Sequence, residues 1–237
     1  MGSARVVAIA GAGGGLGPTV VRAFAAAGDV LALAGREAVK LEALLDNTRV
    51  PSDRRLASAV DLLKEEEAAS WRDEILHKFG RVDVVLHLVG GYKGGTSIAD
   101  IPTDDWTALH QMLVLTTLNV VRAFSVSLRG TVGGRFLAVT SPKVRAPTAR
   151  SAIYSMAKAA SDALVLALAD ELRGSGATAN LIEVDSIDIP EARQTGTPAK
   201  PYGKTTPAEE VAAAMLYLCS SQAATINGIR LALTGRG

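Results

Sequence analysis

The chain has 237 residues, of which 48% are hydrophobic and 21% are charged, a composition that can bury a large core in one α/β domain. Lys and Arg number 25 against 24 for Asp and Glu, so the sequence lacks the basic excess that attracts nucleic acid or an anionic membrane surface. We therefore expect neither a nucleic-acid partner nor attachment to a membrane.

The cysteine and histidine content argues against a disulfide framework and a metal centre. Cys219 is the single cysteine and cannot form an internal disulfide, while His77, His87 and His110 lack the spacing of metal ligands. The apolar run VVAIA near the start is too short for a signal-peptide core or a membrane span, and it predicts a buried strand. We expect no metal and a reducing, cytoplasmic location.

Short apolar runs alternate with longer amphipathic stretches along the whole chain. The runs have strand length and β-branched content, and they cover residues 5–10, 30–34, 55–60, 82–89, 134–140, 178–184 and 229–233. The stretches between them predict helices over 16–27, 64–79, 103–129, 151–173 and 207–220. Strands that are apolar on both faces belong in a parallel sheet covered by helices on each side. The sequence thus predicts one α/β domain over 1–237, a doubly wound parallel sheet of about seven strands.

One long segment departs from this alternation. Residues 186–206 are rich in Pro, Gly and Thr and show no periodicity. A segment of this length inside a compact domain is usually a functional lid or a disordered loop, and we expect a lid over the substrate. The charged run at 64–74, by contrast, is typical of the solvent face of a helix.

The glycine-rich stretch AIAGAGGGLGPTV, residues 8–20, follows the first strand and opens a helix. Glycines here allow a tight turn and the close approach of a pyrophosphate to the free N–H groups at the helix start. Pro18 suits the first helical turn. Two spacings fit equally, one through Gly15 and one through Gly14. The candidate cofactor residues are Gly11, Gly13, Gly15, Leu16 and Gly17.

The end of the second strand indicates which dinucleotide binds. NAD-binding folds carry a carboxylate there for the ribose hydroxyls, whereas a nearby arginine accommodates a 2′-phosphate. This strand ends in Gly35 and Arg36. We therefore favour NADP(H), with NAD(H) possible; the alternative is that Arg36 is a solvated residue at a helix start.

Tyr154 and Lys158 stand four residues apart in a predicted helix and therefore share one face. A nearby ammonium favours the phenolate and lowers the pKa of a tyrosine, and the same lysine can bond the nicotinamide ribose. Alone, the pair is commonly a half-buried tyrosine with a snorkelling lysine. Ser141, at the carboxyl end of the fifth predicted strand, faces the ligand crevice in this architecture and can bond a substrate oxygen.

Together these motifs resemble the short-chain dehydrogenase/reductase family over nearly the whole chain. Further matching pieces are Asp61 and Leu62 after the third strand, DDW at 104–106, Asn180, and the ending TPAEEVAAAMLYLCS with NGIRLAL. The resemblance implies a Rossmann-type fold, with Ser141 positioning substrate, Tyr154 as general acid/base, and Lys158 holding the ribose and lowering the tyrosine pKa. It also implies that Asp61 meets the adenine ring.

The chain departs from the family pattern after the fourth strand. His87 and Leu88 replace the usual asparagines, while Gly90 and Gly91 still leave room for the cofactor. We interpret His87 as a structural residue that fixes the strand end. Tyr92 and Lys93, which follow, are candidate neighbours of the substrate.

Two further departures concern the reaction itself. Leu113 stands where the family commonly has an asparagine that helps to hold a proton-relay water, and Asn119 is too far along to replace it. Val184 and Asp185 stand where Pro-Gly usually precedes the nicotinamide-contacting turn, in which Ile187 is expected to offer backbone contacts.

We expect an NADP(H)-dependent carbonyl reductase or alcohol dehydrogenase that acts on a small carbonyl or alcohol substrate. The departures favour one alternative, a dinucleotide-binding sensor or scaffold of the same fold that has lost turnover. The resemblance implies a homodimer or homotetramer, in which the long apolar helices at 103–129 and 151–173 would form the subunit contact, although packing within one chain explains the same apolar pattern.

Overall fold

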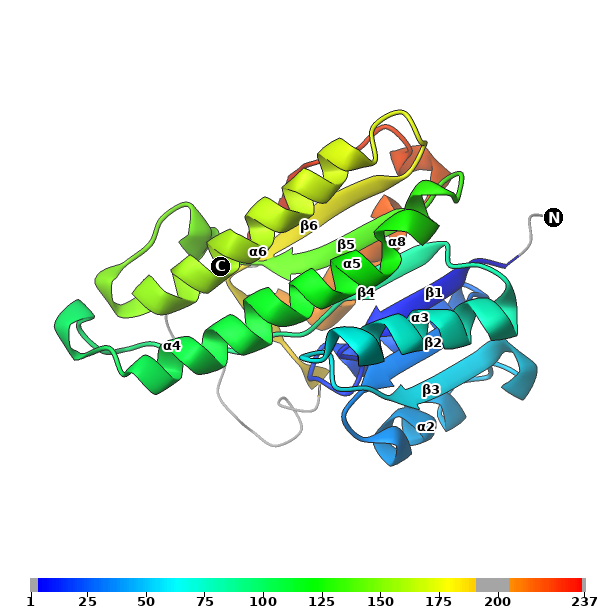
Figure 1. Cartoon of the computed structure of the whole chain (residues 1–237), viewed down its shortest axis with the longest axis horizontal. Helices are drawn as coiled ribbons and strands as arrows, with labels where there is room; N and C mark the ends of the chain where they lie inside the picture. The colour runs from blue at the N-terminus through cyan, green and yellow to red at the C-terminus, as the bar shows by residue number, and fades with distance from the viewer. Residues whose placement is uncertain (1–3, 191–204, 236–237) are drawn as a thin grey trace.

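Seven parallel strands form one sheet in the order β3-β2-β1-β4-β5-β6-β9 (Figure 1). The structure is a computed structural model that describes residues 4–190 and 205–235. The strands are β1 (Val6–Ala10), β2 (Val30–Gly35), β3 (Arg55–Ala59), β4 (Val84–His87), β5 (Arg135–Thr140), β6 (Thr178–Val184) and β9 (Arg230–Leu233). Each overlaps one of the seven predicted runs, so the predicted doubly wound parallel sheet of the Rossmann type is confirmed.

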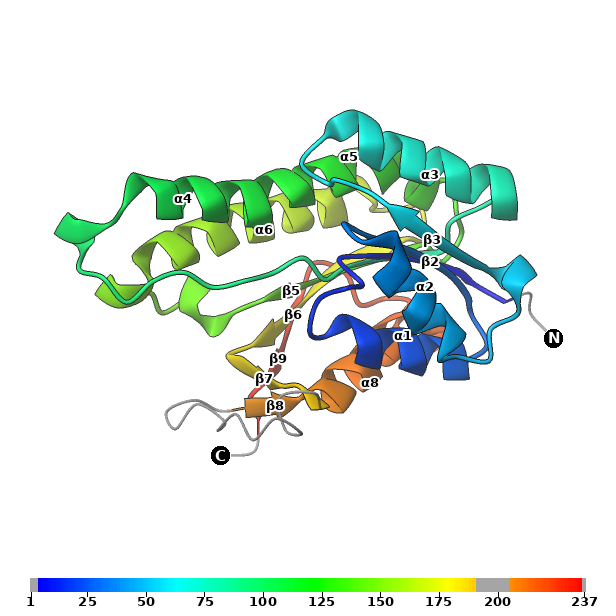
Figure 2. The same cartoon turned by 90° about the horizontal axis from the view of Figure 1, so that it is seen from below.

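The two faces of the sheet carry separate apolar cores. Alternate residues of β1 point to opposite faces, so that Val6 and Ala8 join one core while Val7 and Ile9 join the other. The helices are α1 (Gly17–Ala26), α2 (Ala38–Asp46), α3 (Glu65–Phe79), α4 (Thr103–Leu109), α5 (Thr116–Arg129), α6 (Ala152–Glu171) and α8 (Ala208–Leu218). Figure 2 shows α3, α5 and α6 on one side of the sheet and α1, α2 and α8 on the other. Burial on both faces explains why these strands are continuous apolar runs.

The strand order reverses direction at β1, which pairs with β2 on one side and β4 on the other. In such sheets, ligands bind in the crevice outside the carboxyl ends of the strands at this switch point. The topology therefore places the glycine stretch after β1, Arg36 after β2 and the residues after β4 around one crevice.

Three local features differ from the sequence-based expectation. Helix α2 is absent from the predicted helices, because it has only nine residues and buries only Leu41 and Leu45. The helix predicted over 103–129 contains a π-helical turn, His110–Leu115, between α4 and α5. Within the segment expected to be a loop, β7 (Ser186–Asp188) pairs in parallel with β8 (Thr205–Pro207). The rest of that segment, 191–204, lies outside the described residues.

Two long helical stretches, Thr103–Arg129 and Ala149–Glu171, are apolar enough by length and composition to cross a membrane. Half of each apolar window is buried inside the protein, however. Figure 1 shows them side by side over one face of the sheet. Packing against the sheet and each other therefore accounts for their composition.

Candidate active site

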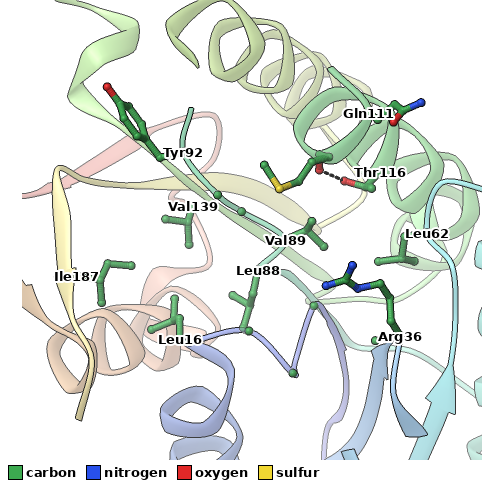
Figure 3. Close-up of a pocket in the computed structure, with 18 of the residues that line it drawn as sticks. Leu16, Arg36, Leu62, Leu88, Val89, Tyr92, Gln111, Thr116, Val139 and Ile187 are labelled. Carbon is green, nitrogen blue, oxygen red and sulfur yellow. Dashed lines mark hydrogen bonds between the residues drawn. The ribbon is translucent and has the colours of Figure 1, made fainter. Parts of the chain in front are cut away.

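A cavity of ≈ 750 Å³ opens at the carboxyl ends of the central strands (Figure 3). Its walls come from the glycine stretch after β1, the ends of β2, β3, β4 and β5, the π-helical turn, α6 and the segment after β6. The predicted site residues on its wall are Gly11, Gly13, Gly15, Leu16, Arg36, Asp61, Leu62, Gly90, Tyr154, Lys158 and Ile187. Gly17 and Ser141 lie behind this wall. The predicted residues are thus gathered in one place, at the switch point of the sheet.

The glycines of the stretch after β1 differ in what surrounds the position where a Cβ would lie. Gly11 has a φ of +78°, and a Cβ there would lie 2.8 Å from the backbone nitrogen of Val89. Gly17 begins α1, where a Cβ would lie 1.8 Å from the carbonyl oxygen of Ala12. Both therefore allow close packing of the backbone. Gly13 also lines the cavity, but a Cβ there would meet nothing closer than 3.7 Å.

The start of α1 offers a cradle without side chains beside the cavity. Pro18 occupies its first turn, as predicted, and Gly13, Gly14 and Gly15 expose backbone next to it. Free N–H groups at a helix start, approached through glycines, suit a pyrophosphate. The residues present therefore fit a dinucleotide.

Arg36 and Asp61 lie together at the end of the cavity formed by β2 and β3. Arg36 is exposed and directs its guanidinium toward the cavity (Figure 3). Asp61 also stabilises its own turn, because its Oδ1 accepts a hydrogen bond from the backbone N–H of Leu63 at 3.1 Å. The carbonyl of Leu62 accepts from Nδ2 of Asn119 at 3.0 Å, so Asn119 holds this loop and is not available elsewhere.

Tyr154 and Lys158 project from α6 into the cavity, one turn apart as predicted. Ser141 is buried at the end of β5, and its side chain is hydrogen-bonded to that of Tyr154. The ammonium of Lys158 donates to the carbonyl oxygen of Val139 at 2.8 Å. The structure therefore brings the three predicted catalytic residues together.

The ionisation of this group differs from the sequence-based expectation. Burial raises the pKa of Tyr154 to about 12; the hydrogen bond with Ser141 opposes this rise, and the charge of Asp185 adds to it. Burial also lowers the pKa of Lys158 to about 8, with Asp162 acting in the opposite direction. The protein on its own thus does not produce the acidic tyrosine that the pairing with Lys158 predicts.

The π-helical turn contains Leu113, which stands where the family commonly has an asparagine. The Leu113 side chain is buried beside Leu109 and Ile153 and offers no polar group. Its carbonyl oxygen accepts two hydroxyls, from Thr117 at 2.6 Å and from Ser161 at 2.7 Å. Two neighbouring hydroxyl groups therefore already use the carbonyl oxygen of Leu113.

Two ion pairs that sequence patterns did not reveal lie next to the reaction end of the cavity, and Asp185 of one of them lines it. Lys143, two residues after Ser141, pairs with Asp185, and Arg145 forms a two-point pair with buried Glu183 at 3.1 and 2.6 Å. These pairs join the turn after β5 to the end of β6. In this chain they hold the segment where the family usually has Pro-Gly.

Residues after β4 flank Tyr154. The ring of Tyr92 packs edge-on against the ring of Tyr154, with centroids 5.0 Å apart, and Tyr92 lines the cavity. Lys93 instead pairs with Asp105 of α4 and is not on the wall. Gln111 and Met112 of the π-helical turn also line the cavity, and no sequence motif marks them.

Comparisons with known proteins agree with this fold. A family model described as enoyl-(acyl carrier protein) reductase matches residues 11–235. The 7alpha-hydroxysteroid dehydrogenase of Escherichia coli (strain K12) is 26% identical over 237 residues, which cover 97% of this chain and 92% of the relative.

Solved structures share the fold at lower identity. The NADPH-bound short chain oxidoreductase from Pseudomonas aeruginosa PAO1, which contains an atypical catalytic center, has a TM-score of 0.85 at 22% identity, covering 98% of this chain and 95% of its own. The 3-ketoacyl-(acyl-carrier-protein) reductase from Brucella melitensis, complexed with NADH, has a TM-score of 0.83 at 23% identity, covering 97% and 96%.

The fold and these likenesses define an NAD(P)-dependent dehydrogenase or reductase. The chain belongs to the short-chain dehydrogenase/reductase family.

Proposed function

We propose that this protein is an NADP(H)-dependent carbonyl reductase or alcohol dehydrogenase that interconverts a small ketone and a secondary alcohol. The observation that carries the proposal is the gathering of Tyr154 and Lys158, with Ser141 next to them, at the cavity that also holds the glycine cradle. A nicotinamide dinucleotide bound there supplies or accepts the hydride.

The side chains of the reaction end divide the remaining work. Tyr154 gives its phenolic proton to the carbonyl oxygen, or takes it back from the alcohol, while Ser141 bonds the same oxygen. Lys158 has two N–H donors beyond the one given to Val139, and these suit ribose hydroxyls. Its ammonium also favours the phenolate once it turns from Val139 toward Tyr154, which offsets the burial that raises the tyrosine pKa.

The preference for NADP(H) is supported by the residues at the end of β2. Arg36 lies on the cavity wall where a 2′-phosphate is accommodated in this fold, and Lys40 of α2 lines the same end. The adjacent Glu37 keeps NAD(H) as a second possible cofactor. The related structures described above include both an NADPH complex and an NADH complex.

The proposal is tested with a panel of ketones, quinones and keto-esters, following oxidation of NADPH and NADH. We expect turnover with NADPH, and Tyr154→Phe should reduce kcat by about 10²–10⁴-fold while leaving cofactor affinity unchanged. Tyr217→Phe, on the exposed face of α8, is the matched control and should behave as the parent. Equal rates for Tyr154→Phe and the parent would refute the role of Tyr154.

A second candidate is a dinucleotide-binding sensor or scaffold without turnover. Two observations favour it, namely the raised pKa of Tyr154 and the apolar side chain of Leu113. It predicts tight binding of NADPH with no oxidation by any carbonyl of the panel, so the same assay separates the two functions.

We further propose a cytoplasmic homodimer or homotetramer that associates through α5 and α6. Val126 on α5 is 79% exposed and Met156 on α6 is 54% exposed, so both leave apolar surface in solvent. Sedimentation of the purified protein tests this, and Val126→Glu should shift it toward monomer. We also propose that residues 186–206 form a lid over the substrate; residues 191–204 lie outside the described residues.

A further inference from the structure

His87 carries a buried polar atom that the reaction described above does not use. It ends β4 and is 3% exposed, and its Nδ1 has no hydrogen-bond partner among the described residues. Buried polar side-chain atoms are nearly always paired, so an unpaired one needs a physical explanation. The interpretation of His87 as a purely structural residue accounts for only one of its two ring nitrogens.

Hydrogen bonding on the other side of the ring fixes the tautomer. Nε2 of His87 lies 3.0 Å from Oγ1 of Thr117, and that hydroxyl donates its single proton to the carbonyl oxygen of Leu113 at 2.6 Å. Thr117 can therefore only accept from His87, so Nε2 carries the hydrogen. Burial, reinforced by the charge of Lys158, lowers the pKa of His87 to about 3. The ring is neutral and presents a lone pair at Nδ1.

The surroundings of Nδ1 are the ends of two neighbouring strands and one lysine. His87 of β4 is the register partner of Ala138 on β5, and Lys158 donates to the carbonyl of the next residue, Val139. Thr140 shares the sheet face of Ala138, and its Oγ1 is also buried without a partner among the described residues. Two unpaired acceptors thus lie at the strand ends beside an ammonium.

The titratable groups around Lys158 come from few elements of the described structure. His87 faces it from β4, and Tyr154 and Asp162 lie one turn away on either side of it along α6. Asp162 is itself paired with Arg230 of β9 at 2.8 Å. Asp162 is therefore shared with Arg230. The neutral imidazole of His87 and the hydroxyl of Thr140 are the neighbouring groups that keep an unused acceptor among the described residues.

We propose that His87 is a positioning residue for Lys158, and that its Nδ1 accepts a hydrogen bond from one water, which in turn accepts a hydrogen bond from the ammonium. The role of Lys158 in turnover rests on the proposed function, whereas the hydrogen bond does not. In this arrangement His87 of β4 supplies a polar side chain near Lys158, which the buried, apolar side chain of Leu113 cannot do. The hydrogen bond stabilises the charged lysine in a buried site, where ammonium groups otherwise lose their proton.

Two substitutions separate the ring nitrogens. His87→Asn keeps a polar atom near the position of Nδ1, and His87→Gln keeps one near that of Nε2. Lys158 is followed without substrate or cofactor by its ¹³Cε resonance against pH, assigned with Lys158→Met. Loss of a hydrogen bond to a charged group corresponds to a shift of about one pH unit. We expect His87→Gln to lower the pKa of Lys158 by about that amount and His87→Asn to leave it near the parent value.

The reverse order would assign the role of His87 to its Thr117 contact and overturn the proposal, as would equal shifts in both variants. A measurement on the unmutated protein does not depend on the variants folding. Long-range ¹H–¹⁵N correlations should show hydrogen on Nε2 and none on Nδ1, and hydrogen on Nδ1 would also overturn the proposal. Since both measurements need no turnover, they can succeed even where the Tyr154→Phe assay fails.

Discussion

The dinucleotide end of the cavity, around Gly11 and Gly17, is shaped by close backbone contacts, whereas its reaction end, around Tyr154 and Lys158, depends on buried polar side chains. At the first end, a single added methyl group would meet a backbone atom at 2.8 Å or less. At the second, burial moves the pKa of the tyrosine up and that of the lysine down. Steric constraint controls one end and the energetics of charge control the other.

This difference determines which residues can be exchanged. A backbone contact that excludes a Cβ admits only glycine, so the dinucleotide end keeps the family pattern. A buried charge can be stabilised by different neighbours, so the reaction end can differ in detail. Here it has His87 and Thr140, whose buried polar atoms lack partners among the described residues, and Asp185, paired with Lys143, where the family usually has the glycine of Pro-Gly.

The largest effect is expected at the steric end, from Gly17→Ala. Its Cβ would lie 1.8 Å from the carbonyl oxygen of Ala12, a backbone atom that cannot move without shifting the turn. We expect a loss of about 3 kcal/mol or more in the free energy of unfolding, a fall of about 6–12 °C in Tm. Gly13→Ala is the matched control, because the nearest atoms to its Cβ are side-chain carbons of Lys40 at 3.7 Å and Leu41 at 3.9 Å, which are ordinary contacts.

Denaturant unfolding and dinucleotide binding measure both variants. Gly13→Ala should keep parental stability yet bind NADPH more weakly, since Gly13 lines the cavity. Equal stability of the two variants would contradict the separation of a packing glycine from a contact glycine.

Arg36→Asp tests the part of the dinucleotide end that relies on charge. If Arg36 binds a 2′-phosphate, the variant should change the ratio of kcat/KM for NADPH to that for NADH by about 10²-fold in favour of NADH. Arg49→Asp makes the same charge change on an exposed residue away from the cavity and should leave the ratio unaltered. A parental ratio in Arg36→Asp would show that Arg36 is only solvated.

The fold was predictable because its strands are buried on both faces and therefore form continuous apolar runs, as Val6 to Ala10 do. Helix α2 was missed because two buried leucines in nine residues give little periodicity. The candidate catalytic pair, Tyr154 and Lys158, was predicted from its i and i+4 spacing, which depends only on local helix geometry.

The sequence could not reveal how the polar groups pair across the fold. The bond between Lys158 and Val139, and the pair of Lys143 with Asp185, join segments that are distant along the chain. The direction in which the pKa of Tyr154 shifts depends on how deeply its side chain is buried, and a sequence motif does not show this. Position 113 was recognised as a departure, but only the structure shows that the Leu113 carbonyl is already occupied.

Lys158→Met tests the reaction end of the cavity through the free energy of unfolding. The pKa of Lys158 is lowered to about 8 in the folded protein against an ordinary 10.5, so below pH 8 the folded state holds a buried charge at a cost. The unfolded chain binds more protons between pH 8 and 10.5, and stability from this group therefore rises with pH over that window. We expect Lys158→Met to be more stable by about 1–3 kcal/mol at pH 7, while losing turnover.

The gain should shrink as pH rises from 8 toward 10.5, where the parent lysine becomes neutral in both states. Unfolding free energies at pH 7 and pH 10 measure this, with Lys64→Met, an exposed lysine, as the control. A loss of stability in Lys158→Met at pH 7 would show that the lysine is fully compensated by its neighbours.

The smallest effect is expected from Asp185→Asn. The carboxylate of Asp185 lines the cavity and raises the pKa of Tyr154, because it repels the phenolate. It is 29% exposed and paired with Lys143, so solvent and the ammonium screen most of its charge. We expect the substitution to lower the pKa of Tyr154 by a few tenths of a unit, measured by tyrosinate absorbance with Tyr154→Phe assigning the titration step.

Asp105→Asn is the control, because it removes a different carboxylate that is paired with a lysine, Lys93, and it should leave the Tyr154 titration step in place. A shift in both variants would mean that Tyr154 senses the net charge of the protein, whereas a shift in Asp185→Asn alone shows that the residue replacing the usual glycine helps to set the acidity of the reaction end.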